Sequence, residues 1–224
     1  MQAKGFIFDF DGLILDTESP QFVIFRDEFA KYGVTFTYED WWKVIGTGFG
    51  VYNPFDHLAR LADDHHDSAY FRQMIDRQIA EALDQTQPFP GVVPFIQDAR
   101  RMNIPMAVAS SSDRDWVRRQ LSRIGLLDFF SSVITADDVS QVKPDPELYL
   151  VAARSLKLQP VECIAFEDSL NGIKSAKAAG IYCIAIPNEI TLEMPLEMAD
   201  QIVRSFSELR IQELMELTIN TNIV

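Results

Sequence analysis

The sequence predicts an α/β protein with a parallel sheet at its core and an α-helical domain inserted after the first strand. From residue 89 onward, short apolar runs alternate with amphipathic stretches, a pattern typical of parallel sheets covered by helices. By contrast, residues 19 to about 85 show helical periodicity and no convincing strand. We therefore assign residues 1–15 and 89–224 to a core domain and residues 16–88 to a helical domain.

The composition disfavours several classes of partner. The chain has 224 residues, of which 47% are apolar, enough for a packed domain with a sizeable insertion. A formal charge of -13, from 33 acidic residues against 20 Lys and Arg, disfavours binding to nucleic acids or anionic membranes. No apolar stretch approaches a membrane span, and Asp9 precedes any signal-peptide core, so we expect a cytoplasmic protein.

The first strand is predicted within residues 6–17, where an apolar, aromatic run ends at Asp9 and Asp11 just before Gly12. Burying ionised carboxylates is unfavourable by several kcal/mol or more unless a partner neutralises them, so this pair indicates a cation or a chemical role. The alternative is a simple turn, which Asp-Gly often opens. Two acids at this spacing on a strand would project to the same side.

The inserted segment is predicted to be a set of helices packed on one another. Apolar residues repeat at helical spacing in two stretches, Phe22, Phe25, Phe29 and Tyr32, and Phe71, Ile75, Ile79 and Leu83. Core packing explains these stripes better than a ligand pocket does. Three alternating glycines in residues 46–50 indicate a loop of this domain, and His65 and His66 an exposed connector rather than a metal site.

Beyond the break at residues 88–91, strands and helices alternate. Strands are expected at residues 106–109, 133–135, 163–166 and 182–186, with helices between them that end near Gly125 and Gly180. Asp145 and Pro146 are placed to start another helix. Cys163 and Cys183 lie in apolar runs, where buried reduced thiols are the ordinary occupants. A last helix with Ile211, Leu214, Met215 and Leu217 is given no chemistry.

Polar residues follow several of these strands. Ligands of parallel sheets bind beyond the carboxyl ends of the strands, and this rule gathers Asp9, Asp11, Ser110, Glu167 and Asp168, with Lys143 in a loop on the same side. Four crowded acids repel one another unless a divalent cation binds between them, most plausibly Mg²⁺, because no His or Cys lies near enough to favour zinc. The cation, the lysine and the serine together form a receptor for phosphate.

A carboxylate at such a site can attack phosphorus to form an aspartyl-phosphate, while a second acid protonates the leaving oxygen and later activates water. The chain carries four ordered motifs, at residues 9–18, residues 110–112, residues 143–146 and residues 167–173. These motifs resemble those of the haloacid dehalogenase-like superfamily, and most closely its β-phosphoglucomutase-like phosphatase branch. The resemblance covers essentially the whole chain and implies a Rossmann-like core with residues 16–88 as an inserted α-helical cap domain.

The resemblance also implies a role for each motif residue. Asp9 is expected to be the nucleophile and Asp11 the general acid and base, with Ser110, Ser111 and Lys143 at the phosphate. Mg²⁺ is expected on the Asp9 side chain, the Asp11 backbone carbonyl and Asp168, with Glu167 as a further or water-mediated ligand. The alternative readings are that Ser110 merely ends a strand and that Lys143 is a solvated loop residue.

Two departures bear on the reaction. Mutases of the branch carry a cap histidine where this chain has Gln21, and an arginine that grips a second phosphate, which residues 46–51 lack. These differences favour a phosphatase acting on a small metabolite such as a sugar phosphate. The alternatives are a hexose-phosphate mutase and a non-catalytic binding protein. Asp11 disfavours dehalogenase and phosphonate-cleaving chemistry, Gly46 and Thr47 are candidates for substrate contact, and cap hinges are expected at residues 15–18 and 86–90.

Overall fold

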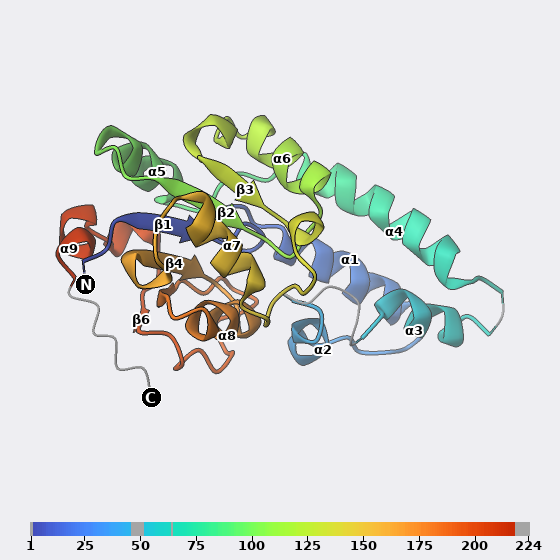
Figure 1. Cartoon of the computed structure of the whole chain (residues 1–224). Helices are drawn as coiled ribbons and strands as arrows, with labels where there is room; N and C mark the ends of the chain where they lie inside the picture. Colours follow the sequence, from blue (N-terminus) through green and yellow to red (C-terminus); the bar gives the residue numbers. More distant parts are fainter. Residues whose placement is uncertain (1, 46–51, 64, 218–224) are drawn as a thin grey trace.

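The computed structural model describes residues 2–45, 52–63 and 65–217 and has a parallel sheet at its centre (Figure 1). Six strands lie in the order β3-β2-β1-β4-β5-β6, and all neighbouring strands are parallel. The strands are β1 (Gly5–Phe8), β2 (Met106–Ala109), β3 (Ser132–Ile134), β4 (Cys163–Glu167), β5 (Tyr182–Ala185) and β6 (Gln201–Ile202). The predicted fold class is confirmed.

The two faces of the sheet bury different kinds of side chain, as the period of two along a strand requires. One face presents small residues, among them Ala107, Ala165 and Cys183, and helices α7 (Glu147–Ser155) and α8 (Leu170–Ala178) pack on it. The other face presents large residues such as Phe8 and Phe166. The small side chains allow close approach of the helices that carry part of the site.

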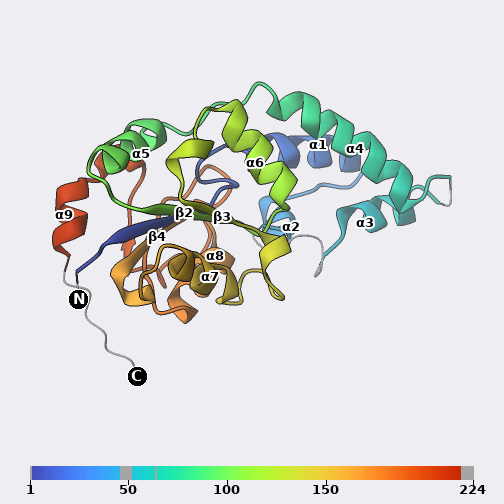
Figure 2. The same ribbon diagram turned by 45° about the horizontal axis from the view of Figure 1, so that its top comes forward.

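The second face is covered by three helices, α5 (Val92–Arg101), α6 (Arg114–Arg123) and α9 (Ile211–Glu216). The Phe8 and Phe166 rings contact each other there in a tilted arrangement with centroids 4.9 Å apart, and the Phe206 ring lies within 6 Å of both. The helices on the two faces make a three-layer core (Figures 1 and 2). Short 3-10 helices complete the core at η2 (Leu127–Phe129), η3 (Ala136–Asp138), η4 (Pro160–Glu162) and η5 (Phe206–Glu208).

The structure differs from the predicted core in three details. Strand β6 was not predicted, because it has only two residues and both are exposed. Strand β1 ends at Phe8, so Asp9 and Asp11 lie in the following loop and the two-residue period does not fix their directions. Helix α7 begins at Glu147, so Pro146 is the N-cap and does not lie in the first turn as predicted. Asp145 accepts a hydrogen bond from the Glu147 N–H at 2.9 Å.

The described part of the inserted segment holds four α-helices, which lie beyond one end of the sheet (Figure 1). They are α1 (Glu18–Ala30), α2 (Tyr38–Trp42), α3 (Pro54–Leu61) and α4 (Ser68–Leu83). Their core is aromatic: Phe29 and Phe36 stack 4.6 Å apart, and Phe25 packs on Trp41 and Phe55. The aromatic stripe of α1 is therefore core, as predicted. His65 and His66 are exposed, and within the described ranges they belong to no metal-binding group.

The two connecting segments between the helical segment and the core lie side by side. Leu15 forms a β-bridge with Pro88, and the Phe89 N–H donates to the Ile14 carbonyl at 3.0 Å. Arg123 of α6 donates to the carbonyls of Asp84 at 3.2 Å and Thr86 at 3.0 Å, just after α4. This pairing joins the stretches predicted as hinges.

Two predictions concern the chain as a whole. No described helix combines the length and the apolar character needed to cross a membrane. Cys163 and Cys183 are buried free thiols, as predicted, and burial raises the pKa of Cys163 to about 12.

Candidate active site

Lys143 lies at the centre of a cluster of acids at the carboxyl ends of the strands. Its side chain is 2% exposed, and its ammonium group donates to Asp9 Oδ1 and, at 2.7 Å, to Glu167 Oε1. The same Glu167 oxygen accepts from the Tyr149 hydroxyl of α7 at 2.6 Å. Lys143 is thus a buried partner of two carboxylates and not a solvated loop residue.

The cluster holds three carboxyl groups and one ammonium group. Burial raises the pKa of Asp9 to about 8, against the lowering effect of Lys143, and burial also raises the pKa of Asp168 well above its usual value. Burial alone would lower the pKa of Lys143, but Asp9 and Glu167 raise it above its ordinary value, so the lysine stays charged. The three carboxyl groups of Asp9, Glu167 and Asp168 therefore share one ammonium, and a further cation bound among them would favour their ionised forms.

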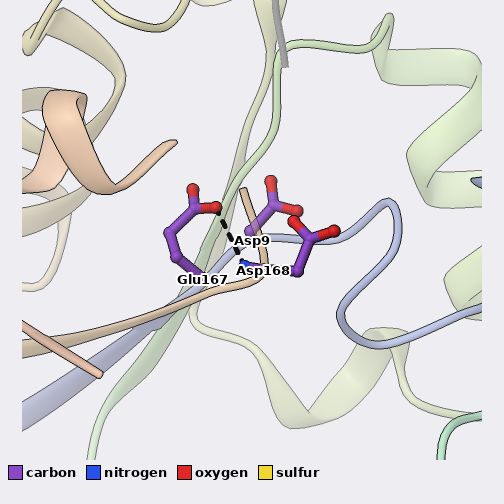
Figure 3. Close-up of side chains that lie close together, drawn as sticks. All are labelled: Asp9, Glu167 and Asp168. Atoms are coloured by element: carbon purple, nitrogen blue, oxygen red, sulfur yellow. Dashed lines mark hydrogen bonds between the residues drawn. The ribbon is translucent and has the colours of Figure 1, made fainter. Parts of the chain in front are cut away.

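The three carboxylates have the geometry of a metal-binding group. Asp9, Glu167 and Asp168 each offer an oxygen within 4.8 Å of the others, and all three residues are buried (Figure 3). Glu167 is also held by the backbone N–H of Asp168 at 3.2 Å. An oxygen-only donor set with excess negative charge fits Mg²⁺. Among the described residues, the Asp11 carboxylate is not part of this group, and contact of the Asp11 backbone carbonyl with a metal stays a prediction.

Asp11 faces a different set of partners. Its Oδ2 accepts hydrogen bonds from the hydroxyls of Ser112 at 2.7 Å and Ser110 at 3.2 Å, and its Oδ1 accepts from the Trp116 indole N–H at 3.0 Å. Trp116 lies in the first turn of α6. Asp113 caps this helix by accepting a hydrogen bond from the Trp116 backbone N–H at 2.7 Å. Ser112 and Trp116 were not predicted as partners of Asp11, since no local sequence pattern links them to a loop about a hundred residues away.

The two predicted phosphate-binding serines differ in their bonding. Ser110 is 1% exposed and accepts from the Ser112 backbone N–H at 3.0 Å in addition to its bond with Asp11. The Ser111 hydroxyl is buried and has no hydrogen-bond partner among the described residues. A buried hydroxyl without a partner is unfavourable, so its position beside the cavity points to a ligand.

A cavity of about 560 Å³ lies over these groups and is lined by both parts of the chain. The core contributes Asp9, Asp11, Ser110, Ser111, Lys143 and Asp168, together with Trp116 and Arg119. Helices α1, α2 and α4 contribute the opposite wall, including Glu18, Gln21, Trp41, Arg72 and Asp76. Gly46 and Thr47, the candidates for substrate contact, lie outside the described residues.

Two glycines of the motifs are required by close approach. Gly12 has φ +77°, and a Cβ there would lie 2.4 Å from Asp168 Oδ2. A Cβ on Gly172 would lie 2.0 Å from the Glu167 carboxylate. Both glycines therefore make room for the acids, and their place in the motifs was the only sequence signal of this role.

A parallel α/β core with acids and a buried lysine under a helical cap defines a class of hydrolase, and the comparisons with known proteins agree. The profile of the family "Haloacid dehalogenase-like hydrolase" matches residues 6–186. The "Putative phosphatase YhcW" of Bacillus subtilis (strain 168) is 39% identical over 213 residues, 95% of this chain and 96% of that protein. The chain belongs to the haloacid dehalogenase-like hydrolases.

Two further similar proteins indicate the branch of the family to which the chain is related. The "Fructose-1-phosphate phosphatase YqaB" of Escherichia coli (strain K12) is 31% identical over 185 residues, covering 81% of this chain and 95% of that protein. The crystal structure of a "putative beta-phosphoglucomutase" from Thermotoga maritima has a TM-score of 0.77 and 25% identity, over 95% of this chain and 99% of that one. The predicted superfamily and branch, and the prediction of a phosphatase enzyme, are confirmed.

Proposed function

We propose that the chain is a Mg²⁺-dependent phosphatase that hydrolyses the phosphomonoester of a small metabolite, such as a sugar phosphate, through an aspartyl-phosphate on Asp9. One observation carries this proposal: Lys143 holds Asp9 Oδ1 at the base of the cavity, while Asp9 Oδ2 accepts no hydrogen bond from the described residues. An oriented carboxylate with one unoccupied oxygen is suited to nucleophilic attack.

In the first half-reaction, Asp9 Oδ2 attacks phosphorus and the bond from phosphorus to the leaving oxygen breaks. Asp11 would donate a proton to that oxygen, so that the metabolite leaves as an alcohol. The hydroxyls of Ser110 and Ser111 would donate to the phosphoryl oxygens, and Lys143 would balance their charge and keep Asp9 oriented. Ser111 supports this assignment because its buried hydroxyl has no partner among the described residues.

In the second half-reaction, Asp11 would take a proton from water as the water oxygen attacks the phosphoryl group. Inorganic phosphate then leaves and the Asp9 carboxylate is restored. The residues that would hold Mg²⁺ are Asp9, Asp168 and the Asp11 backbone carbonyl, with Glu167 direct or through water. Mg²⁺ bound there would offset negative charge on the phosphoryl oxygens.

Residues 16–88 are proposed to act as a cap that closes over the cavity and excludes water, with residues 1–15 and 89–224 as the catalytic core. The bridged connecting segments at Leu15 and Pro88 support this division, because motion there would move α1 to α4 as a unit. The cytoplasmic location stays a prediction.

The closest alternative is a hexose-phosphate mutase, favoured by the structural likeness to the Thermotoga maritima protein. Gln21 argues against it. It lines the cavity where the mutases have a histidine, and its side-chain amide donates to the Thr17 carbonyl of its own helix at 2.7 Å. A glutamine amide cannot take up or release a proton as a histidine imidazole can.

The test is a phosphate-release screen over phosphorylated metabolites with Mg²⁺, repeated with EDTA. We expect release of inorganic phosphate that EDTA abolishes. If a β-hexose 1-phosphate with a bisphosphate activator gave isomer faster than phosphate, the mutase assignment would replace this one. No release from any compound of a broad panel would favour a non-catalytic binding protein.

A further inference from the structure

Asn188 lies beside the candidate metal site, in the loop that follows β5, and no motif includes it. The residue is 8% exposed, and all of its side-chain polar atoms are hydrogen-bonded. A buried amide with a complete set of partners has one orientation, because rotating it by 180° would put its N–H groups against other donors.

The amide nitrogen of Asn188 joins two parts of the site. It donates to Asp168 Oδ2 at 2.8 Å and to the Gly12 carbonyl at 2.9 Å. Gly12 follows the loop of Asp9 and Asp11, whereas Asp168 follows β4. One side chain therefore fixes the distance between the two segments that supply the acids, while Asp168 Oδ1 accepts no hydrogen bond from the described residues.

The amide oxygen of Asn188 holds its own loop. It accepts from the backbone N–H groups of Ile190 at 2.8 Å and Thr191 at 3.1 Å. The Ile190 carbonyl in turn accepts from the Trp42 indole N–H of α2 at 2.7 Å. The loop is thus anchored on one side to the acids and on the other to the helical segment.

We propose that Asn188 is a positioning residue for the candidate metal ligand Asp168: by holding Asp168 Oδ2 and the Gly12 carbonyl, it sets the carboxylate at the distance that binds a divalent cation. Partners of this kind, bonded to a ligand and not to the metal, typically change metal affinity by about 10-fold to 100-fold when they are removed. This inference rests on the metal site of the proposed function.

The test measures Mn²⁺ binding to the full chain, by calorimetry and by the electron paramagnetic resonance signal of free Mn²⁺. Asn188→Ser is the informative variant, because a serine hydroxyl still accepts from the loop N–H groups but is too short to reach Asp168. We expect Asn188→Ser to bind Mn²⁺ about tenfold more weakly. Asn188→Ala, which also loses the loop bonds, should bind at least as weakly as Asn188→Ser.

Trp42→Phe is the matched control, because it removes one hydrogen bond to the same loop and leaves the Asn188 amide intact. Its Mn²⁺ affinity should stay within twofold of the wild type. Equal losses in Trp42→Phe and Asn188→Ser would show that only general anchoring of the loop matters and would overturn the inference. Wild-type affinity in Asn188→Ser would do the same.

Asp168→Asn separates a failure of this inference from a failure of the proposed function. It should lose Mn²⁺ binding if Asp168 is a ligand. If Asp168→Asn bound Mn²⁺ like the wild type, or if the wild type bound none, the metal site itself would be wrong and Asn188 would have no ligand to position. If only Asn188→Ser bound like the wild type, the metal site would stand without this positioning role.

Discussion

The acid and lysine cluster of the core and the cap wall face the same cavity, yet they are built differently. The cluster consists of Asp9, Lys143, Glu167 and Asp168, and its bonds join segments as far as 134 residues apart. The cap wall includes Glu18, Gln21 and Trp41, and their hydrogen bonds stay within the segment 16–88.

This difference separates two tasks. Long-range ion pairs fix the cluster relative to the sheet, so its geometry is set before any ligand binds. The cap wall rests on aromatic contacts within the inserted segment, such as those of Phe25 with Trp41 and Phe55. We propose that the core carries out the chemistry and that the cap wall selects the substrate. Four substitutions test this contrast, from the largest expected effect to the smallest.

Asp9→Asn should have the largest effect. An amide cannot serve as the nucleophile, so kcat should fall by at least about 10⁴-fold while the fold is retained. The kcat is measured by phosphate release from an aryl phosphate in the presence of Mg²⁺. Asp137→Asn is the control, since Asp137 accepts a hydrogen bond from the Arg114 backbone N–H at 2.7 Å and lies outside the cluster. A loss below tenfold in Asp9→Asn would remove Asp9 from the mechanism.

Lys143→Met should lower kcat/KM by about 10²-fold to 10³-fold, the range seen when one preorganised charge-stabilising donor is removed. It should also lower the free energy of unfolding by about 3 to 5 kcal/mol, because two buried carboxylates lose their cation. Steady-state kinetics and urea unfolding measure the two effects. A fully active and equally stable variant would contradict the contrast between the cluster and the cap wall.

Trp116→Phe should separate substrates by their leaving groups. The variant keeps the ring and removes the N–H that orients Asp11. Alkyl phosphates need a proton on the leaving oxygen, so their kcat/KM should fall about tenfold, whereas a nitrophenyl phosphate should lose less than threefold. Trp42→Phe, whose N–H does not contact Asp11, is the control. Equal losses for both substrates would indicate a structural role only.

Glu18→Gln tests the cap wall through stability. Burial raises the pKa of Glu18 from about 4.5 to about 8, although the Trp41 indole N–H donates to it at 2.8 Å. The folded state therefore binds the proton more tightly than the unfolded state, and the stability that this proton contributes is lost as pH rises from about 4.5 to 8.

Between pH 5 and pH 9 the wild type should accordingly lose about 4 kcal/mol more of its free energy of unfolding than Glu18→Gln, a difference of about 10 °C in Tm. Thermal unfolding at a series of pH values measures the difference. Parallel pH profiles of the two proteins would mean that Glu18 is not held protonated, and the cap wall would then resemble the cluster in carrying an ionised acid.

Much of the site was predictable because of one property of parallel sheets. Strands that alternate with helices must end at one edge, so polar residues after β1, β2 and β4 meet there regardless of their separation in sequence. Asp9, Ser110, Glu167 and Asp168 are found at that edge for this reason. The apolar period of α4 and the phenylalanine stripe of α1 likewise determined which faces of the cap helices are buried.

The sequence by itself thus determined the fold class, the order of the elements and the residues gathered at the strand ends. Only the tertiary structure decided which atoms meet. Trp116 contacts Asp11 across a separation of 105 residues. Asn188 joins Gly12 to Asp168, and its contact with Gly12 spans 176 residues. No local period encodes such contacts, because they depend on the packing angle of α6 and on a loop after β5, and both are fixed only when the whole core is assembled.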